Sequence, residues 1–96
     1  VYLTPEQREQ ALTLSQSIDL ARELARQGGT DCRTILEAVR QKIEVGPEAK
    51  VDYLQICHRE TLAEQERVDA DSVLLLAVFV GSTRLIDNGF ILGPVD

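Results

Sequence analysis

Cysteine and histidine, which supply many nucleophiles and metal ligands, are scarce in this sequence of 96 residues, with two of the first and one of the second. Cys32 and Cys57 fall in different expected elements and form no Cys-x-x-Cys pair. We therefore expect reduced, buried thiols rather than a disulfide framework or a zinc site. His58 follows Cys57 in an expected strand, where adjacent side chains point to opposite faces, so the two do not form a nucleophile–base pair. Cys32 lies near an expected helix N-terminus, whose dipole would lower the pKa of its thiol.

The sequence also lacks a phosphate-binding loop, an excess of positive charge and a long apolar segment. The glycine pair at 28–29 lacks the spacing and the preceding strand of a phosphate-binding loop. The net charge of −6, from 16 acidic and 10 basic residues, disfavours nucleic acid and anionic membranes as partners. No apolar run approaches the roughly 18 to 20 residues that a membrane span needs, and no basic region precedes an apolar stretch at the N-terminus. We therefore expect a single cytoplasmic domain with no nucleic-acid or membrane partner.

Two helices are expected in the first half of the chain. The sequence TPEQ begins the first, with Thr4 as the N-cap, proline at the first helical position and Gln7 where a capping box takes Glu or Gln. Apolar residues then recur at steps of three and four until a Gly-Gly pair ends the helix. Thr30 or Asp31 caps a second amphipathic helix, which stops before Gly46.

The period changes after the second helix. The sequence KVDYLQICH alternates as a strand, which predicts Val51, Tyr53 and Cys57 on one face and Leu54 and Ile56 on the other. Residues 59–71 are charged and irregular, and a short turn of helix is expected at 60–64. Their acidic cluster has no calcium-loop spacing and is expected to be a solvated loop.

Two more strands complete the expected fold. The run from Ser72 to Val80 is apolar on both faces, which is typical of a central strand. Gly81 and Ser82 form a tight turn, and the third strand is expected to end at the sequence Asp-Asn-Gly of residues 87–89, because Asn-Gly favours hairpin turns. The fold class is thus α+β, with two helices packed as one layer against a three-stranded antiparallel sheet.

Three separated segments of this chain form a recognisable set: YLTPEQR at the start, VDYLQI in the middle and GSTRLIDN near the end. In order and spacing, and over nearly the whole chain, they resemble the pantothenate synthetase (pantoate–β-alanine ligase) family. The matching residues are Tyr2, Leu3, Thr4, Glu6, Arg8, Asp52, Tyr53, Gly81, Thr83, Arg84, Leu85, Ile86, Asp87 and Asn88.

The resemblance implies that residues 1–96 are the C-terminal lid domain of this enzyme, without the N-terminal nucleotide-binding domain. The family joins pantoate to β-alanine with ATP and Mg, releases AMP and diphosphate, and forms a pantoyl adenylate. Its His-x-Gly-His and Ser-Ser-Arg-Asn motifs do not occur here, so the chain alone is expected to bind no ATP and to be inactive. Some relatives continue into a cytidylate kinase, and the sequence leaves this open. The alternative is a small acidic protein-interaction module with no ligase function.

The resemblance makes Tyr2, Arg84, Asp87 and Asn88 candidate lid or interdomain contacts. Arg84 and Asp87 fall on opposite strand faces and are not expected to pair. We expect Asp87 to accept hydrogen bonds from turn amides near Gly89, and Arg84 to reach a carboxylate of the acidic loop, the helices or the missing domain. Because both helices are expected on one side of the sheet, the other side presents an uncovered apolar row, and self-association is expected.

Overall fold

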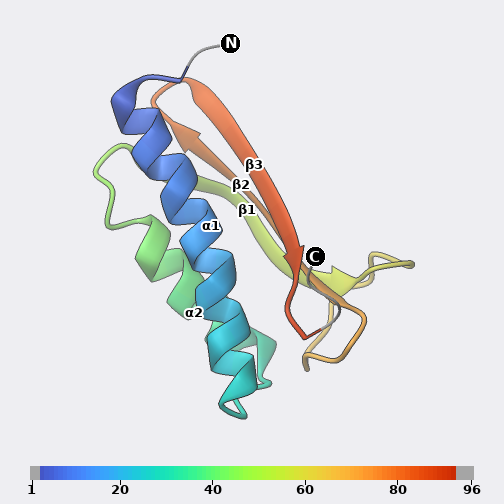
Figure 1. Ribbon diagram of the computed structural model, residues 1–96. Coiled ribbons are helices and arrows are strands. Elements are labelled where there is room, and N and C mark those ends of the chain that lie inside the picture. The colour runs from blue at the N-terminus through green and yellow to red at the C-terminus, as the bar shows by residue number, and fades with distance from the viewer. Residues whose placement is uncertain (1–2, 93–96) are drawn as a thin grey trace.

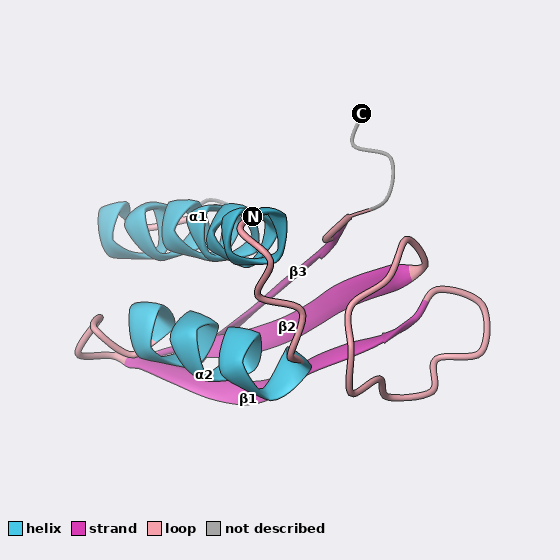
Figure 2. Ribbon diagram, turned by 90° about the horizontal axis from the view of Figure 1, so that it is seen from below, coloured by secondary structure: helices cyan, strands magenta, loops and turns pink. Residues whose placement is uncertain are grey.

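The structure is a computed structural model, and it describes residues 3–92 of the chain. Both helices lie on the same side of an antiparallel sheet with the strand order β1-β2-β3 (Figures 1 and 2). The expected fold class is confirmed. The elements in chain order are α1 (Pro5–Arg26), α2 (Cys32–Ile43), β1 (Ala49–His58), β2 (Ser72–Val80) and β3 (Thr83–Phe90).

The helix boundaries follow from the expected capping signals. The Gln7 backbone amide donates to Thr4 Oγ1 at 3.1 Å and the Thr4 amide donates to Gln7 Oε1 at 3.0 Å, which completes the capping box. Gly28, with a φ of 96°, follows the end of α1 in a conformation that glycine adopts readily. Asp31, rather than Thr30, caps α2 by accepting a hydrogen bond from the Arg33 amide at 3.0 Å.

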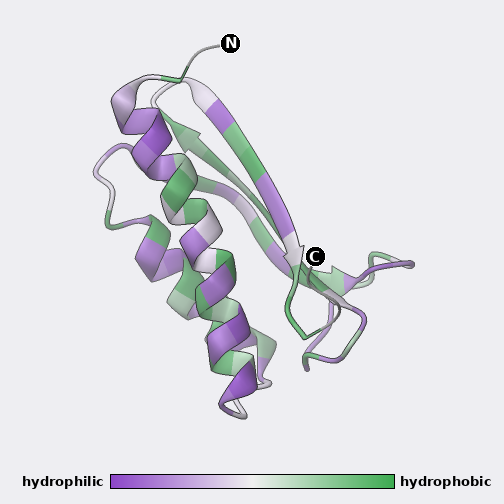
Figure 3. Ribbon diagram, viewed as in Figure 1, coloured by the Kyte–Doolittle hydropathy of each residue, from purple (hydrophilic) through white to green (hydrophobic). Residues whose placement is uncertain are grey.

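The core lies between the helices and one face of β2. Every second side chain of β2 points to that face and is buried there. These side chains pack against the apolar stripes of both helices. The opposite face has no helix over it (Figure 2). β2 is nevertheless hydrophobic along its length, whereas β3 alternates (Figure 3). The core side chains are Leu14, Ile18, Ala21, Ala25, Cys32, Ile35, Val39, Ile43, Ile56, Val68, Leu74, Leu76, Val78, Val80 and Ile91.

The expected faces of β1 are wrong at its start, because the strand contains a β-bulge. Val51 pairs with Val78 and Tyr53 pairs with Ala77, so Asp52 has no partner of its own on β2. The extra residue reverses the alternation, and Val51 packs on the core together with Leu54 instead of sharing a face with Tyr53. Asp52 and Tyr53 are both exposed. We call the sheet side away from the helices, with Tyr53 on it, the open face.

The expected end of β3 is also wrong. The strand continues through Asn88 and Gly89, which pair with Leu75 and Leu74 of β2. Gly89 serves a close helix–strand contact, because a Cβ there would lie 2.9 Å from Arg22 Nη2 and 3.0 Å from the Cγ2 atom of Ile18. The tight turn is confirmed at Gly81 and Ser82, between the paired residues Val80 and Thr83. Gly81 has a φ of 61°, the positive value that the first turn residue of a type II′ hairpin needs.

The loop between β1 and β2 contains no helix, contrary to the expected helical turn at 60–64. It folds back on the end of β1 instead. The His58 amide donates to the Ala63 carbonyl at 2.9 Å, and the Gln65 amide donates to the Ile56 carbonyl at 3.0 Å. This pairing supplies hydrogen-bond partners to the outer edge of β1 where the strand ends.

Replacing Gly89 with alanine is expected to lower the free energy of unfolding by about 1–2 kcal/mol, because the new methyl group would crowd the Ile18 and Arg22 side chains of α1. Displacing Arg22 would also strain the hydrogen bond from its Nε atom to the Phe90 carbonyl, which measures 2.8 Å. Urea denaturation gives the value. Asn88→Ala is the matched control, since Asn88 is exposed, and its effect should stay below about 0.5 kcal/mol. A more stable Gly89→Ala variant would contradict the close contact, because alanine otherwise suits a strand better than glycine.

Candidate functional site

Residues 3–8 of the segment YLTPEQR meet the segment GSTRLIDN at the end of the domain where α1 and β3 begin (Figure 1). Gln7 Nε2 donates a hydrogen bond to Thr83 Oγ1 at 2.6 Å, across 76 residues of sequence. The side-chain oxygen of the same glutamine accepts the Thr4 amide. Gln7 therefore caps the helix and also fixes it to the first residue of β3, a second role that the capping pattern alone did not predict.

The segments VDYLQI and GSTRLIDN meet through Arg84. Its Nε and Nη2 atoms both lie 3.0 Å from Asp52 Oδ2. Its guanidinium carbon lies 5.7 Å from the centre of the Tyr53 ring, within the range of a cation–π interaction. Asp52 is the residue that the bulge leaves unpaired, and the bulge is what places Tyr53 on the same side of the sheet as Arg84. Within the described residues Arg84 therefore reaches a carboxylate of β1 and not one of the acidic loop or the helices. A contact of Arg84 with the missing domain stays a prediction.

The remaining candidate residues lie apart from Arg84. Asp87 Oδ1 accepts a hydrogen bond from the Asn88 amide at 2.8 Å within an unbroken strand, so the expected turn near Gly89 does not form. Asn88 is exposed, and by alternation it shares the open face with Arg84. Tyr2 lies outside the described residues. The structure therefore gathers Arg84 with Asp52 and Tyr53, and leaves Asp87 and Asn88 further along β3.

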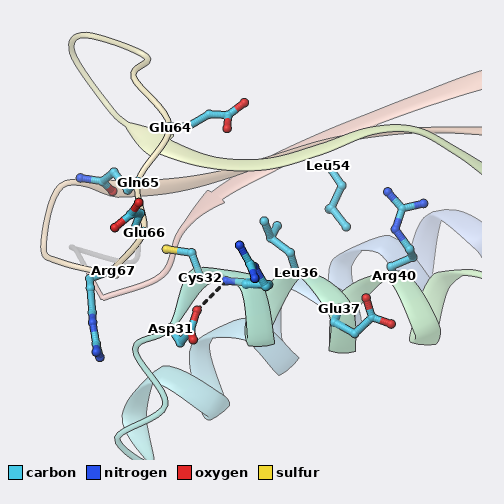
Figure 4. A pocket seen from close by; sticks show the side chains of 11 residues that line it. Asp31, Cys32, Leu36, Glu37, Arg40, Leu54, Glu64, Gln65, Glu66 and Arg67 are labelled. Carbon is cyan, nitrogen blue, oxygen red and sulfur yellow. Dashed lines mark hydrogen bonds between the residues drawn. The ribbon is translucent and has the colours of Figure 1, made fainter.

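The pKa of the Cys32 thiol shifts in the direction opposite to the expected one. Burial of the thiol, and then the negative charges of Asp31 and Asp69, raise its pKa above the ordinary value of 9.0. These effects outweigh the helix N-terminus, which would favour the thiolate. The expectation of two free, buried cysteines is confirmed for Cys32 and Cys57. The groove beside Cys32 is lined by acidic and basic side chains from α2 and the loop at 64–67 (Figure 4).

The acidic loop forms contacts among its own residues. Asp71 Oδ1 lies 2.9 Å from Arg59 Nε, and Asp71 Oδ2 lies 3.6 Å from His58 Nε2. Asp69 Oδ1 accepts a hydrogen bond from the Asp71 amide at 2.8 Å. Within residues 3–92 no cluster of three or more His, Cys, Asp or Glu side chains is arranged to hold a metal ion. Over the same residues no helix has the length and hydrophobicity to cross a bilayer.

The fold is a two-layer α+β domain. Hydrogen bonds connect the described parts of the segments YLTPEQR, VDYLQI and GSTRLIDN with one another. A sequence model of the pantoate–β-alanine ligase family matches residues 1–90. The chain is 52% identical over 88 residues to the pantothenate synthetase of Syntrophus aciditrophicus, a match that covers 92% of this chain and 31% of the relative. It is 40% identical over 87 residues to a bifunctional pantoate ligase/cytidylate kinase of Thermosynechococcus vestitus, a match that covers 91% of this chain and 17% of that protein.

A solved structure agrees with the sequence relatives. The crystal structure of pantothenate synthetase from Thermus thermophilus matches with a TM-score of 0.83 and 35% identity, over 97% of this chain and 33% of that one. The chain belongs to the pantoate–β-alanine ligase family and corresponds to its C-terminal domain. It spans about a third of the length of the pantothenate synthetases that it matches.

The contact between Asp52 and Arg84 is expected to give a coupling energy of roughly 0.2–1 kcal/mol, because the two side chains are 39% and 42% exposed and water screens the pair. The measurement is a double-mutant cycle of Asp52→Ala and Arg84→Ala by urea denaturation. The coupling should shrink at high salt. A parallel cycle of Arg84→Ala with Asp87→Ala is the control and should be additive. Coupling to Asp87 but not to Asp52 would contradict the bulged register.

Proposed function

We propose that this chain is the C-terminal lid domain of an ATP-dependent ligase that joins pantoate and β-alanine through a pantoyl adenylate and releases AMP and diphosphate. The observation that supports this most is the structural match to a pantothenate synthetase over 97% of the chain, with 35% identity. The similarity therefore extends over the whole domain and is not limited to short motifs. In this proposal residues 1–96 form the lid, and a separate nucleotide-binding domain precedes it.

The lid acts by covering the reaction. An acyl adenylate is a mixed anhydride that water hydrolyses, so a domain that closes over it protects the intermediate. The preceding domain would hold ATP, Mg, pantoate and β-alanine, and the 96 residues alone would bind no ATP. Arg84 and Asn88 are the proposed contacts from the open face, since both are exposed there. When the lid closes, Arg84 would either form a new contact while it keeps Asp52 as a partner, or replace Asp52 with the new partner.

The proposal predicts activity only when both parts of the enzyme are present. The N-terminal two thirds of the Syntrophus aciditrophicus pantothenate synthetase, fused in front of Val1, should form pantothenate and AMP in equal amounts. The 96-residue chain alone should form neither and should give no saturable amide shifts with Mg-ATP in NMR titrations.

Two results would contradict this prediction. A folded fusion that makes no pantothenate would favour the acidic interaction module. Saturable shifts of the isolated chain at micromolar Mg-ATP would show that a nucleotide site lies within the domain.

We also propose that the isolated chain self-associates through the open face. Val73, Leu75 and Phe79 of β2 lie there only partly covered, and Ile86 of β3 is 59% exposed. An isolated chain has only another copy of itself to cover them, and a face-to-face two-fold dimer would bury them.

Self-association is expected as a reversible dimer at high micromolar concentration, measured by light scattering after gel filtration. Ile86→Lys should give a monomer, because each charge would be buried in the interface. Leu12→Lys is the matched control, since Leu12 is also 59% exposed but lies on α1, away from the open face. A wild-type monomer, or equal loss of the dimer in both variants, would contradict the proposed interface.

A further inference from the structure

The loop between β1 and β2 starts with a closed turn at residues 58–63, which projects from the end of the sheet (Figure 1). The Leu62 amide donates to the His58 carbonyl, and the His58 amide donates to the Ala63 carbonyl, both at 2.9 Å. The Ala63 amide also donates to Thr61 Oγ1 at 3.2 Å. We call residues 58–63 the His58 turn. It lies outside the three segments that resemble the ligase family.

Both nitrogens of the His58 imidazole have a neighbour. Nδ1 accepts a hydrogen bond from the Glu60 amide at 3.1 Å, and Nε2 lies 3.6 Å from Asp71 Oδ2. Nδ1 can accept only while it carries no proton, so the closed turn holds a neutral imidazole with its proton on Nε2. The ring is 28% exposed and can take up a proton from water. Acidification would therefore convert the acceptor of the Glu60 amide into a second donor.

The backbone of Leu62 makes the His58 turn easy to open. Leu62 has a φ of 61°, a left-handed conformation that is unfavourable for residues other than glycine. Its side chain is 61% exposed, so burial does little to offset this cost. Hydrogen bonds within the turn must offset it instead. Each of these bonds therefore matters to the balance between the closed turn and a relaxed, open one.

The charged groups around His58 come from the turn, from the segment that returns along β1 and from the residue before β2. They are Arg59, Glu60, Glu64 and Asp71, and the residue opposite His58 on β2 is the uncharged Ser72. Asp71 favours the protonated imidazole, although Arg59 Nε lies 2.9 Å from its other oxygen and shares its charge. Histidine is the only one of these side-chain types whose charge ordinarily changes between about pH 5 and 8. A change of the turn in this range would therefore follow the protonation of His58.

We propose that the His58 turn is a pH-sensitive element, closed while the imidazole is neutral and open once it is protonated. In the protonated ring the Nδ1–H faces the Glu60 N–H, and two donors cannot bond to each other. Asp71 keeps the charged ring in place at Nε2 without giving the Glu60 amide a new acceptor. With this hydrogen bond lost, Leu62 relaxes to an ordinary negative φ and the turn opens. The proposal does not depend on the ligase activity.

An NMR titration of the 96-residue chain from about pH 8 to pH 5 tests the proposal. At pH 8 the ring nitrogen shifts should show the proton of His58 on Nε2. As the ring titrates, the Glu60 and Leu62 amide resonances should shift with the same midpoint. The φ of Leu62, obtained from three-bond couplings and backbone shifts, should change from positive to negative. Amides of β2 should keep their resonances, because the change is confined to the turn.

Three variants separate the switch from a general effect of acid. His58→Asn places a side-chain oxygen where Nδ1 lies and cannot titrate in this range, so its turn should stay closed at both ends of the titration. His58→Leu has no acceptor, and its turn should be open at both ends. Asp71→Asn removes the charge that favours the protonated ring, so the turn should still open but at a lower pH.

Four results would overturn the proposal. The first is a Leu62 φ that stays positive while His58 titrates, and the second is the same pH response in His58→Asn as in the natural chain. The third is a closed turn in His58→Leu at pH 8, which would show that the Glu60 hydrogen bond is dispensable. The fourth is loss of the β2 resonances together with those of the turn, since this would mean that the whole domain unfolds.

Discussion

The structure depends on covering one face of β2, the central strand, with both helices. Leu74, Leu76 and Val78 of that face are fully buried, and each buried side chain of this size contributes about 1.5–3 kcal/mol through the hydrophobic effect. The helices must approach the sheet closely to exclude water, and α1 comes so near β3 that a Cβ at position 89 would crowd the side chains of Arg22 and Ile18. This packing fixes where α1 begins relative to β3, and so fixes the contact between Gln7 and Thr83.

The same packing explains why residues far apart in sequence share a surface. With one face of the sheet covered, the position of each polar strand residue depends on the register of its strand. The extra residue at Asp52 keeps Val51 and Leu54 on the core while Asp52 and Tyr53 remain exposed. Arg84, one strand beyond β2, then reaches both Asp52 and Tyr53. The family's signature residues in β1 and β3 therefore form one contact, which a regular strand would not allow.

The fold was predictable where local chemistry decides the outcome. The capping box at Thr4, the glycine turn at Gly81 and the apolar run of β2 each carry their own signal, and each was confirmed. The bulge at Asp52 was not predictable, because alternation within one strand does not reveal an extra residue until the strand pairs. The turn expected at Gly89 failed because contact with α1 overrides the local preference of Asn-Gly. Burial and nearby carboxylates, which are likewise non-local, reversed the expected pKa shift of Cys32. The motifs identified Arg84 as a candidate, but only the strand pairing identified its partner.

The register of β1 against β2 is the point on which this account can be tested most directly. Inter-strand nuclear Overhauser effects in the labelled 96-residue chain report which residues lie opposite one another. The account predicts contacts of Val51 with Val78 and of Tyr53 with Ala77, and no residue opposite Asp52. A regular ladder with Asp52 opposite Ala77 would contradict it, because that register would turn Tyr53 toward the helices and remove it from Arg84.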